Sequence, residues 1–155
     1  MKLFSDAAEY GLRAVVWLTD HPEQSWTVRE IAAGTLSRPG YLVKVLQALA
    51  RAGIVASQRG VGGGVSLEAD PQQVTILDVL NAVDPVARIT VCPLRLKSHG
   101  TRLCSLHRRV DNAIALIEAE FSKVTISDLV RDSNPSHPLC ESDDRLVRLG
   151  LRRGM

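Results

Sequence analysis

The sequence contains few of the features that mark secreted, disulfide-linked or membrane proteins. Cysteine occurs only 3 times in 155 residues, and aromatic residues make up 4% of the chain. No apolar run approaches the roughly 18 residues of a membrane span, and the segment 1–6 lacks the apolar core of a signal peptide. These absences predict a cytoplasmic protein without membrane contact, whose cysteines suit a metal, a cluster or a free thiol better than a structural disulfide.

Motifs of known catalytic chemistry are also absent. The chain has acids and bases, such as Glu9, His21 and His107, but no nucleophile elbow, paired-carboxylate motif, metalloprotease helix or phosphate loop. The glycine-rich segment 60–64 is followed neither by Gly-Lys-Ser/Thr nor by a helical pattern, so it does not predict a nucleotide site. We therefore expect that the protein is not an enzyme.

Size and charge allow one domain with a modest extension. Hydrophobic residues make up 45% and charged residues 23% of the chain, which is enough for a sizeable core. The formal net charge of +2 does not by itself indicate a nucleic-acid partner. A DNA-binding surface would therefore have to come from local clustering of Lys and Arg.

Three helices are predicted in the first third of the chain. Apolar residues between positions 3 and 18 recur at helical spacing. Thr27 and Glu30 have the spacing of a capping box, so a short second helix should begin there. Ser37 can cap a third helix, which has Pro39 in its first turn and ends near Gly53. The outer face of this third helix should be polar and basic, with Arg38, Tyr41, Lys44, Gln47 and Arg51.

A hairpin and a short helix should follow. Residues 54–58 and 65–67 have strand patterns and are joined by a glycine-rich turn that begins at Arg59. Another helix is predicted from Thr75 to Val83. Helix, short helix, basic helix and hairpin is the order of a winged helix-turn-helix, which predicts a fold that is mainly α with one small β-hairpin.

This order of elements favours binding to double-stranded DNA. An α-helix fits the major groove, and an arginine on a glycine-rich wing can enter a narrow minor groove. The candidate DNA contacts are Thr27, Arg29, Ser37, Arg38, Pro39, Gly40, Tyr41, Lys44, Arg59 and Gly60. One alternative is a basic face that is merely solvated, and the order of the four elements argues against it. The other is a winged fold that binds only proteins, and the clustering of basic residues on one surface argues against that.

The second half of the chain divides into a loop, a long helix and a tail. We expect a DNA-binding domain over 1–83, a sensor loop over 84–104, helices over 105–131 and a flexible tail over 132–155. Within the helical part, residues at approximate three-four spacing form a stripe: Leu106, Val110, Ala113, Ile117, Glu120 or Phe121, and Val124. A last short helix should begin at Thr125.

Several motifs together resemble the IscR/NsrR family (Rrf-type) of winged helix-turn-helix regulators. They are MKL at 1–3, YGLRA at 10–14, YLVKVL at 41–46 with Leu49, AGIV at 52–55, SQRG at 57–60, GGG at 62–64 and TILDV at 75–79. The resemblance implies a homodimer that binds a palindromic operator. It also implies that residues 37–44 read the major groove, Arg59 the minor groove, and that 106–124 form the dimer helix. Residues 43–44 are more similar to the nitric-oxide-sensing branch.

The loop before the long helix is the candidate sensor. Cys92 and Cys104 bracket it, His99 lies between them, and His107 follows three residues after the second cysteine. Thiolates with imidazoles suit an iron–sulfur cluster or zinc. Three readings stay open at this point: a cluster, a thiol-reactive loop without a cofactor, and a zinc site of these four residues. We expect Cys140, in the tail, to be an exposed free thiol.

The resemblance implies a particular ligand set for a cluster. Cluster-binding members carry a third cysteine between the other two, and this chain has Ser98 there. A cluster, 2Fe–2S rather than 4Fe–4S, would then be held by Cys92, Cys104 and His107 or His99. Glu9, contributed by the first helix of the partner subunit, would be the fourth ligand. Loss or modification of the cluster would shift the dimer helix and change the spacing of the two DNA-reading helices.

Overall fold

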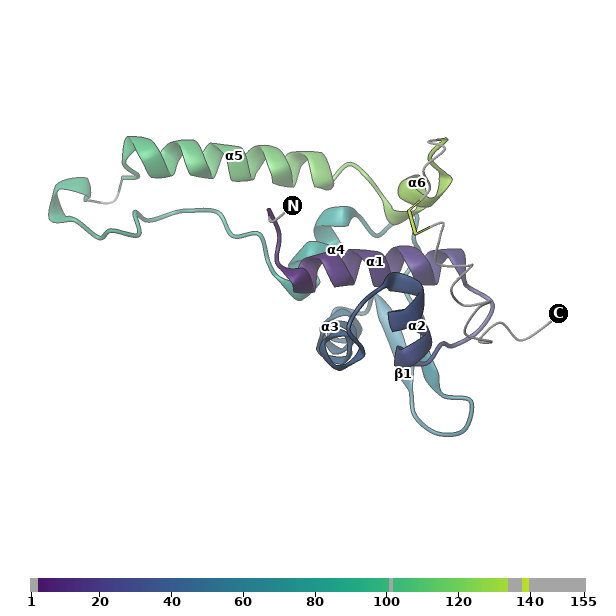
Figure 1. The fold of residues 1–155 in the computed structure, drawn as a ribbon. Helices are drawn as coiled ribbons and strands as arrows, with labels where there is room; N and C mark the ends of the chain where they lie inside the picture. The colour runs from purple at the N-terminus through teal and green to yellow at the C-terminus, as the bar shows by residue number, and fades with distance from the viewer. Residues whose placement is uncertain (1–2, 101, 134–137, 140–155) are drawn as a thin grey trace.

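A long first helix organises the structure around it (Figure 1). The computed structural model describes residues 3–100, 102–133 and 138–139. α1 (Asp6–Asp20) begins after Ser5, whose side chain accepts a hydrogen bond from the backbone of Ala8. The apolar stripe predicted the helix from residue 3, but Phe4 precedes this cap and packs instead against the ring of Phe121, at 5.7 Å. The inner face of α1, which includes Trp17, is buried in the core.

The next two helices form a helix-turn-helix. α2 (Val28–Thr35) begins with the predicted capping box of Thr27 and Glu30. α3 (Pro39–Arg51) has Pro39 as its first residue, as predicted, but the predicted cap at Ser37 is wrong. Arg38 holds the cap position without a side-chain hydrogen bond. The Ser37 hydroxyl lies instead 2.9 Å from the buried hydroxyl of Thr35, which also donates to the Ile31 carbonyl at 2.7 Å.

The predicted wing is present as a two-stranded antiparallel hairpin. β1 (Val55–Gln58) pairs with β2 (Gly64–Leu67), with Gln58 opposite Gly64. The turn needs positive φ at Gly60 (103°) and Gly62 (78°), which glycine adopts without steric cost. Trp26 pairs with Val65 and so joins the hairpin to the segment before α2. In Figure 1 the hairpin turn projects from the body below α2 and α3.

Two short helices complete the body. α4 (Ile76–Val83) and α6 (Ile126–Arg131) each begin with a capping box, at Thr75 and Thr125, which pair with each other through a β-bridge. α1 packs against both helices and against α2 and α3. The main core therefore lies around α1, and its fully buried large side chains include Trp17, Leu18, Ile31, Leu42, Leu49 and Ile126.

The remaining elements form an arm that extends beyond this body. The segment after α4 runs out along α5 (Ser105–Phe121) and turns back near η1 (Lys97–His99), as Figure 1 shows. No residue of α5 is buried, even though the helix carries large apolar side chains. Leu106, Val110 and Leu116 are 62%, 42% and 73% exposed. A helix of this composition normally buries its apolar stripe against another element. Residues 134–137 and 140–155, including Cys140 and most of the expected tail, lie outside the described residues.

Among the described residues, no helix is long and apolar enough to span a membrane.

Candidate DNA interface and cysteine centre

The outer face of α3 carries the predicted recognition residues. Leu42, Val45, Leu46 and Leu49 hold the inner face of the helix in the core. Arg38, Tyr41 and Lys44 are consequently exposed on the opposite side. The Tyr41 ring packs edge-on against Tyr10 of α1, with centroids 5.7 Å apart. This contact fixes one exposed side chain of α3 against the body.

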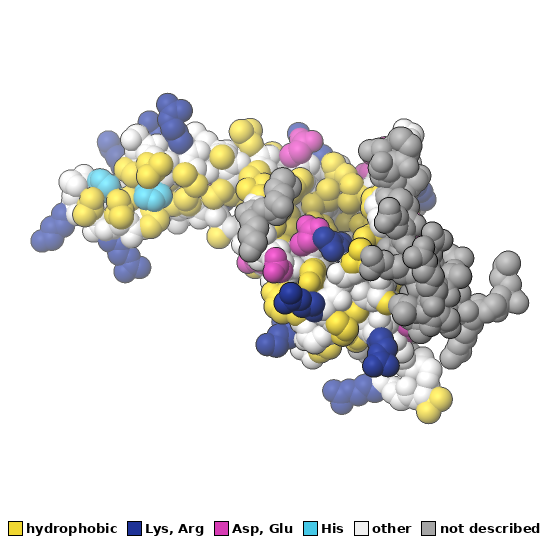
Figure 2. All heavy atoms as spheres, in the orientation of Figure 1, with side chains coloured by type: hydrophobic (Ala, Val, Ile, Leu, Met, Phe, Trp, Pro, Cys, Tyr) yellow, Lys and Arg dark blue, Asp and Glu magenta, His cyan; other side chains and the backbone are white. Residues whose placement is uncertain are grey.

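The wing adds a second basic region next to α3. Arg59 and Gly60 are exposed at the start of its turn, and Val61 at the tip is exposed as well. Figure 2 shows Lys and Arg side chains along the lower edge of the molecule, over α3 and the hairpin. Within the described part of the chain, Arg38, Lys44 and Arg59 make no ion pair. Their charges are thus available to phosphates.

The other predicted DNA contacts differ in how free they are. Arg29, Pro39 and Gly40 are exposed, with side chains or backbone open to solvent. The hydroxyl of Thr27 is occupied by Glu30, to which it donates at 2.8 Å, and the hydroxyl of Ser37 is bound to Thr35. Arg29, Pro39 and Gly40 are therefore accessible, whereas Thr27 and Ser37 have local structural partners.

A side-chain link connects α1 to the turn of the helix-turn-helix. Arg13 donates to the Glu9 carboxylate at 2.8 and 3.0 Å and to the backbone carbonyl of Thr35 at 3.3 Å. Thr35 is the last residue of α2, and the next residue, Leu36, is left-handed with φ of 55°. Glu9 is thus coupled through Arg13 to the turn that precedes α3.

The cysteines and histidines of the loop meet at the far end of the arm. His99 Nδ1 lies 3.1 Å from Cys92 Sγ, and His107 Nδ1 lies 3.1 Å from Cys104 Sγ and 3.6 Å from Cys92 Sγ. The donor atoms of Cys92, His99 and Cys104 all lie within 4.8 Å of one another. We refer to Cys92, His99, Cys104 and His107 as the cysteine centre.

The two thiols of the cysteine centre have different surroundings. Cys92 is 2% exposed, whereas Cys104 is partly exposed and occupies the N-cap position of α5. The pKa of Cys104 is lowered to about 7, first by the backbone N–H of His107 and then by the His107 side chain, both of which stabilise its thiolate. A thiolate at a helix N-terminus is a nucleophile and a metal ligand at neutral pH.

Comparison with known proteins agrees with this geometry. A family model described as Rrf2, iron-dependent transcriptional regulator, matches residues 4–132. The chain belongs to the Rrf2 family. The family assignment agrees with the resemblance found in the sequence, and it makes this chain a member of a family of transcriptional regulators.

Solved structures confirm the mainly helical winged fold of this Rrf2 protein. CymR, the global cysteine regulator of B. subtilis, is 22% identical over 83% of this chain and 96% of its own, with a TM-score of 0.65. IscR from T. potens is 21% identical over 84% of this chain and 88% of its own, with a TM-score of 0.68. A Listeria innocua protein described as a transcriptional regulator is 26% identical over 85% and 88%, with a TM-score of 0.62.

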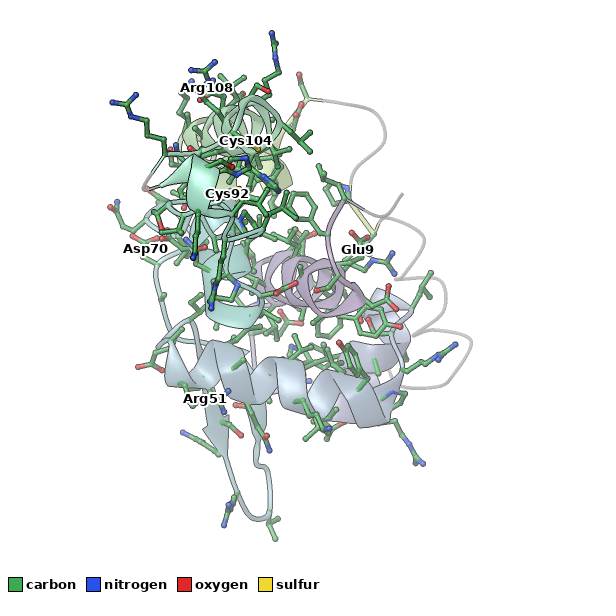
Figure 3. The ribbon with its side chains drawn as sticks, turned by 90° about the vertical axis from the view of Figure 1, so that its left-hand side faces the viewer. Glu9, Arg51, Asp70, Cys92, Cys104 and Arg108 are labelled. Carbon is green, nitrogen blue, oxygen red and sulfur yellow. The ribbon has the colours of Figure 1, made fainter. Side chains whose placement is uncertain are left out.

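Within one chain of this Rrf2 protein, Glu9 lies apart from the cysteine centre, and its role as a ligand contributed by the partner subunit stays a prediction. Figure 3 shows Cys92 and Cys104 together, with Glu9 apart from them on α1. Glu9 instead lines a cavity of about 480 Å³ that also contains Asp6, Tyr10 and Arg38. Within one chain, the nitrogen donors of His99 and His107 are the groups next to the thiols.

Sequence analysis missed the ion pair that holds the arm of this Rrf2 protein together. Arg88 donates to both oxygens of Asp111 at 2.6 and 2.7 Å, and the Ile89 backbone N–H donates to the same carboxylate at 2.9 Å. Arg88 also lies 3.7 Å from Glu118. The pair joins the segment that leads to Cys92 to the middle of α5. No local motif signals a pair that is separated by 23 residues in sequence.

Proposed function

We propose that this protein is a homodimeric transcriptional regulator that binds a palindromic double-stranded DNA operator and reads a redox, nitric oxide or iron–sulfur signal at the cysteine centre. One observation carries the DNA-binding part: in an Rrf2 chain, the basic side chains of α3 and the wing are exposed and unpaired within the described residues. Phosphate contacts supply most of the affinity for duplex DNA, and such free cations suit them.

The proposed contacts divide by groove. The start of α3, from residue 37 to Lys44, would enter the major groove, with Arg38, Tyr41 and Lys44 facing DNA. Arg59 and Gly60 on the wing would approach the minor groove. Thr27 and Arg29, at the start of α2, would meet the backbone, where exposed Arg29 can pair with a phosphate.

The proposed dimer forms through α5. None of Leu106, Val110, Ala113 and Ile117 in its stripe is buried within the described chain, and α5 extends beyond the winged body (Figure 1). The inner end of the stripe, at Ile117, lies near other segments, where it shares a pocket with Phe4 and Val86. A second copy that packs its own α5 against this stripe would bury it, in the way coiled-coil helices bury theirs. Such a dimer would present two α3 helices to two half-sites.

The resemblance implies an iron–sulfur cluster, preferably 2Fe–2S, at the cysteine centre. Cys92, Cys104 and His107 or His99 would be three of its ligands, with Glu9 of the partner subunit as the fourth, and the cluster would supply one-electron redox chemistry. The fit is incomplete because Ser98 stands where a third thiolate is expected. A second candidate is direct reaction of the two thiols, whose sulfur atoms lie within 4.8 Å of each other.

The DNA-binding part is tested by selection of a site. From random-sequence duplexes, the full-length protein should select a palindrome with half-sites about one helical turn, or a multiple of it, apart. Fluorescence anisotropy should then show weaker binding for Lys44→Ala and unchanged binding for Lys123→Ala, which alters a cation that follows α5 and is paired with Glu120. If no sequence is enriched, the proposed function is wrong.

The sensing part has its own test. Operator affinity of the anaerobic wild-type protein should change after addition of nitric oxide or hydrogen peroxide. The double variant Cys92→Ser, Cys104→Ser should show no such change, because it has lost both thiols. If wild type and variant respond alike, the signal is read elsewhere while the DNA-binding part stands.

A further inference from the structure

We propose that Cys92, His99, Cys104 and His107 of a single chain bind one Zn²⁺ ion in a tetrahedral site. The proposal rests on the proposed function for the role of the centre, and it puts a single Zn²⁺ ion in place of the iron–sulfur cluster considered there. The four residues supply two thiolates and two imidazoles, which is the donor set of Cys₂His₂ structural zinc sites.

The spacing of the donor atoms fits a single ion. Zn–S and Zn–N bonds of about 2.3 and 2.05 Å at a tetrahedral angle place neighbouring S and N donors about 3.5 Å apart. The three S···N distances in the centre are 3.1, 3.1 and 3.6 Å. His107 Nδ1 lies near both sulfur atoms and His99 Nδ1 near that of Cys92. The donor atoms of Cys92, His99 and Cys104 already lie within 4.8 Å of one another, and His107 would complete the set around one cation.

The same spacing does not fit a cluster. In a 2Fe–2S cluster, the ligands of one iron are separated from those of the other by the whole iron–sulfide core. Here the donor atoms of Cys92, His99 and Cys104 lie within 4.8 Å of one another, and one imidazole nitrogen contacts both thiols. Ser98 is exposed and supplies no third thiolate.

The backbone brings His99 into the position of the missing ligand. The 3₁₀ turn η1 ends at His99, whose backbone N–H donates to Leu96 at 2.9 Å, and Gly100 follows with φ of 53°. Nearer the first cysteine, the backbone N–H of Arg95 donates to the Cys92 carbonyl at 3.0 Å. These two turns direct a residue one position after Ser98 back onto the buried Cys92 thiol.

The end of the arm lacks a core that would hold it closed. Around the centre, Val91, Leu94 and Leu96 are 59%, 60% and 50% exposed, and Cys92 is the buried residue of segment 91–100. Short segments that bury so little apolar surface are commonly held by a metal. A Zn²⁺ ion bound to residues 92, 99, 104 and 107 would clip the loop to the first turn of α5.

Metal analysis of the full-length protein tests the proposal directly. Protein purified without oxygen should contain one zinc per chain by elemental analysis and no sulfide. Replacement of zinc by Co²⁺ should give the intense visible bands of a tetrahedral ion with thiolate-to-cobalt charge transfer. His99→Ala should lower Zn²⁺ affinity in chelator competition at least about tenfold. Ser98→Ala, the matched control next to it, should leave this affinity unchanged.

A stability readout separates a lost ligand from a misfolded chain. The thermal midpoint of the wild type should rise with added Zn²⁺, as expected when a ligand binds only the folded state. The midpoint of His99→Ala should rise less, although its circular dichroism spectrum in the absence of metal matches that of the wild type. Ser98→Ala should respond to Zn²⁺ as the wild type does.

Several results would overturn the zinc site. They are stoichiometric iron and sulfide in place of zinc, octahedral Co²⁺ spectra, equal Zn²⁺ affinities for His99→Ala and Ser98→Ala, or no metal binding at all. Operator affinity measured on the same samples keeps the two proposals apart. A zinc protein that selects no DNA sequence would overturn the proposed function and leave the zinc site intact.

Discussion

Asp111 is a single carboxylate whose contacts tie the arm together. Hydrogen bonds from the Arg88 side chain and the Ile89 backbone lower its pKa from 3.8 to about 2, despite an opposing desolvation effect. A carboxyl group with a lowered pKa stabilises the folded state fully above its ordinary pKa. That contribution is lost as the pH falls through the folded-state pKa.

We therefore predict a pH-dependent effect for Asp111→Asn. At neutral pH the variant should be less stable than the wild type, and the difference should shrink as the pH falls from about 4 to about 2. Urea denaturation followed by circular dichroism across this range gives the two stabilities. Arg88→Ala should show the same convergence, because it removes the main cause of the shift. A constant difference between wild type and Asp111→Asn at all pH values would contradict the prediction.

Position 34 has room only for glycine, because α2 approaches the Trp17 ring closely there. A Cβ built at Gly34 would lie 2.3 Å from Trp17 Nε1 and 2.6 Å from Cε2, and Trp17 is 1% exposed. A buried indole has little room to retreat, so Gly34→Ala should lower the free energy of unfolding by about 1–3 kcal/mol. Gly40→Ala is the control, because a Cβ there meets no atom within 4 Å. Equal urea midpoints for the two variants would show that the core accommodates the extra methyl group.

At the residue scale, the sequence predicted the kind of site at the cysteine centre better than it predicted which side chains contact one another. The types and order of Cys92, Cys104 and His107 indicated a metal or thiol site before any geometry was known. The sequence left open whether His107 or His99 would join the two cysteines, because the position of His99 depends on how η1 turns the chain. Ser37 was predicted as the cap of α3, but its side chain is hydrogen-bonded to the buried hydroxyl of Thr35 instead.

The elements themselves follow closely from local patterns. Three capping boxes, beginning at Thr27, Thr75 and Thr125, each have both reciprocal hydrogen bonds. Their signal is contained within four consecutive residues, so tertiary contacts are not needed to recognise it. The start of α1 was misplaced by three residues because the apolar stripe continues into Phe4, which packs on α5 rather than extending the helix.

The wing is the element whose proposed role is most directly measurable. Arg59 is exposed at its turn and makes no ion pair with another described residue. If it neutralises a phosphate, Arg59→Ala should reduce the slope of log affinity against log salt by about one unit for each protomer bound. Arg131→Ala, on α6, should leave the slope unchanged. An unchanged slope for Arg59→Ala would remove the wing arginine from the interface.

At the scale of the whole molecule, the arm is the part that sequence patterns could not place. Periodicity predicted a long amphipathic helix near residues 106–124, but it carries no information about what the apolar face contacts. The structure directs α5 outward along the segment after α4 and holds it there through Arg88 and Asp111. The outer part of the α5 stripe, with Leu106 and Val110, is therefore exposed in one chain, and we expect a second molecule to bury it.

That dependence gives a prediction about assembly. Val110 is 42% exposed and lies in the middle of the α5 stripe. A glutamate there would place two carboxylates in the apolar contact of a symmetric dimer, where neither can be solvated or paired. Val110→Glu should weaken the dimer by at least about tenfold, or roughly 1.4 kcal/mol. Light scattering should show the wild type at twice the 16.9 kDa of one chain and the variant shifted toward the monomer.

The control adds the same charge to the same helix. Asn112 lies about 200° around α5 from Val110, on an exposed face away from the stripe. Light scattering should therefore give Asn112→Glu the same dimer mass as the wild type. Because a monomer presents one α3 helix to one half-site, Val110→Glu should also lose most of its affinity for a full palindrome while binding a single half-site like the wild-type protomer. If Val110→Glu stays dimeric, the subunits meet through another surface and α5 needs a different partner to cover its stripe.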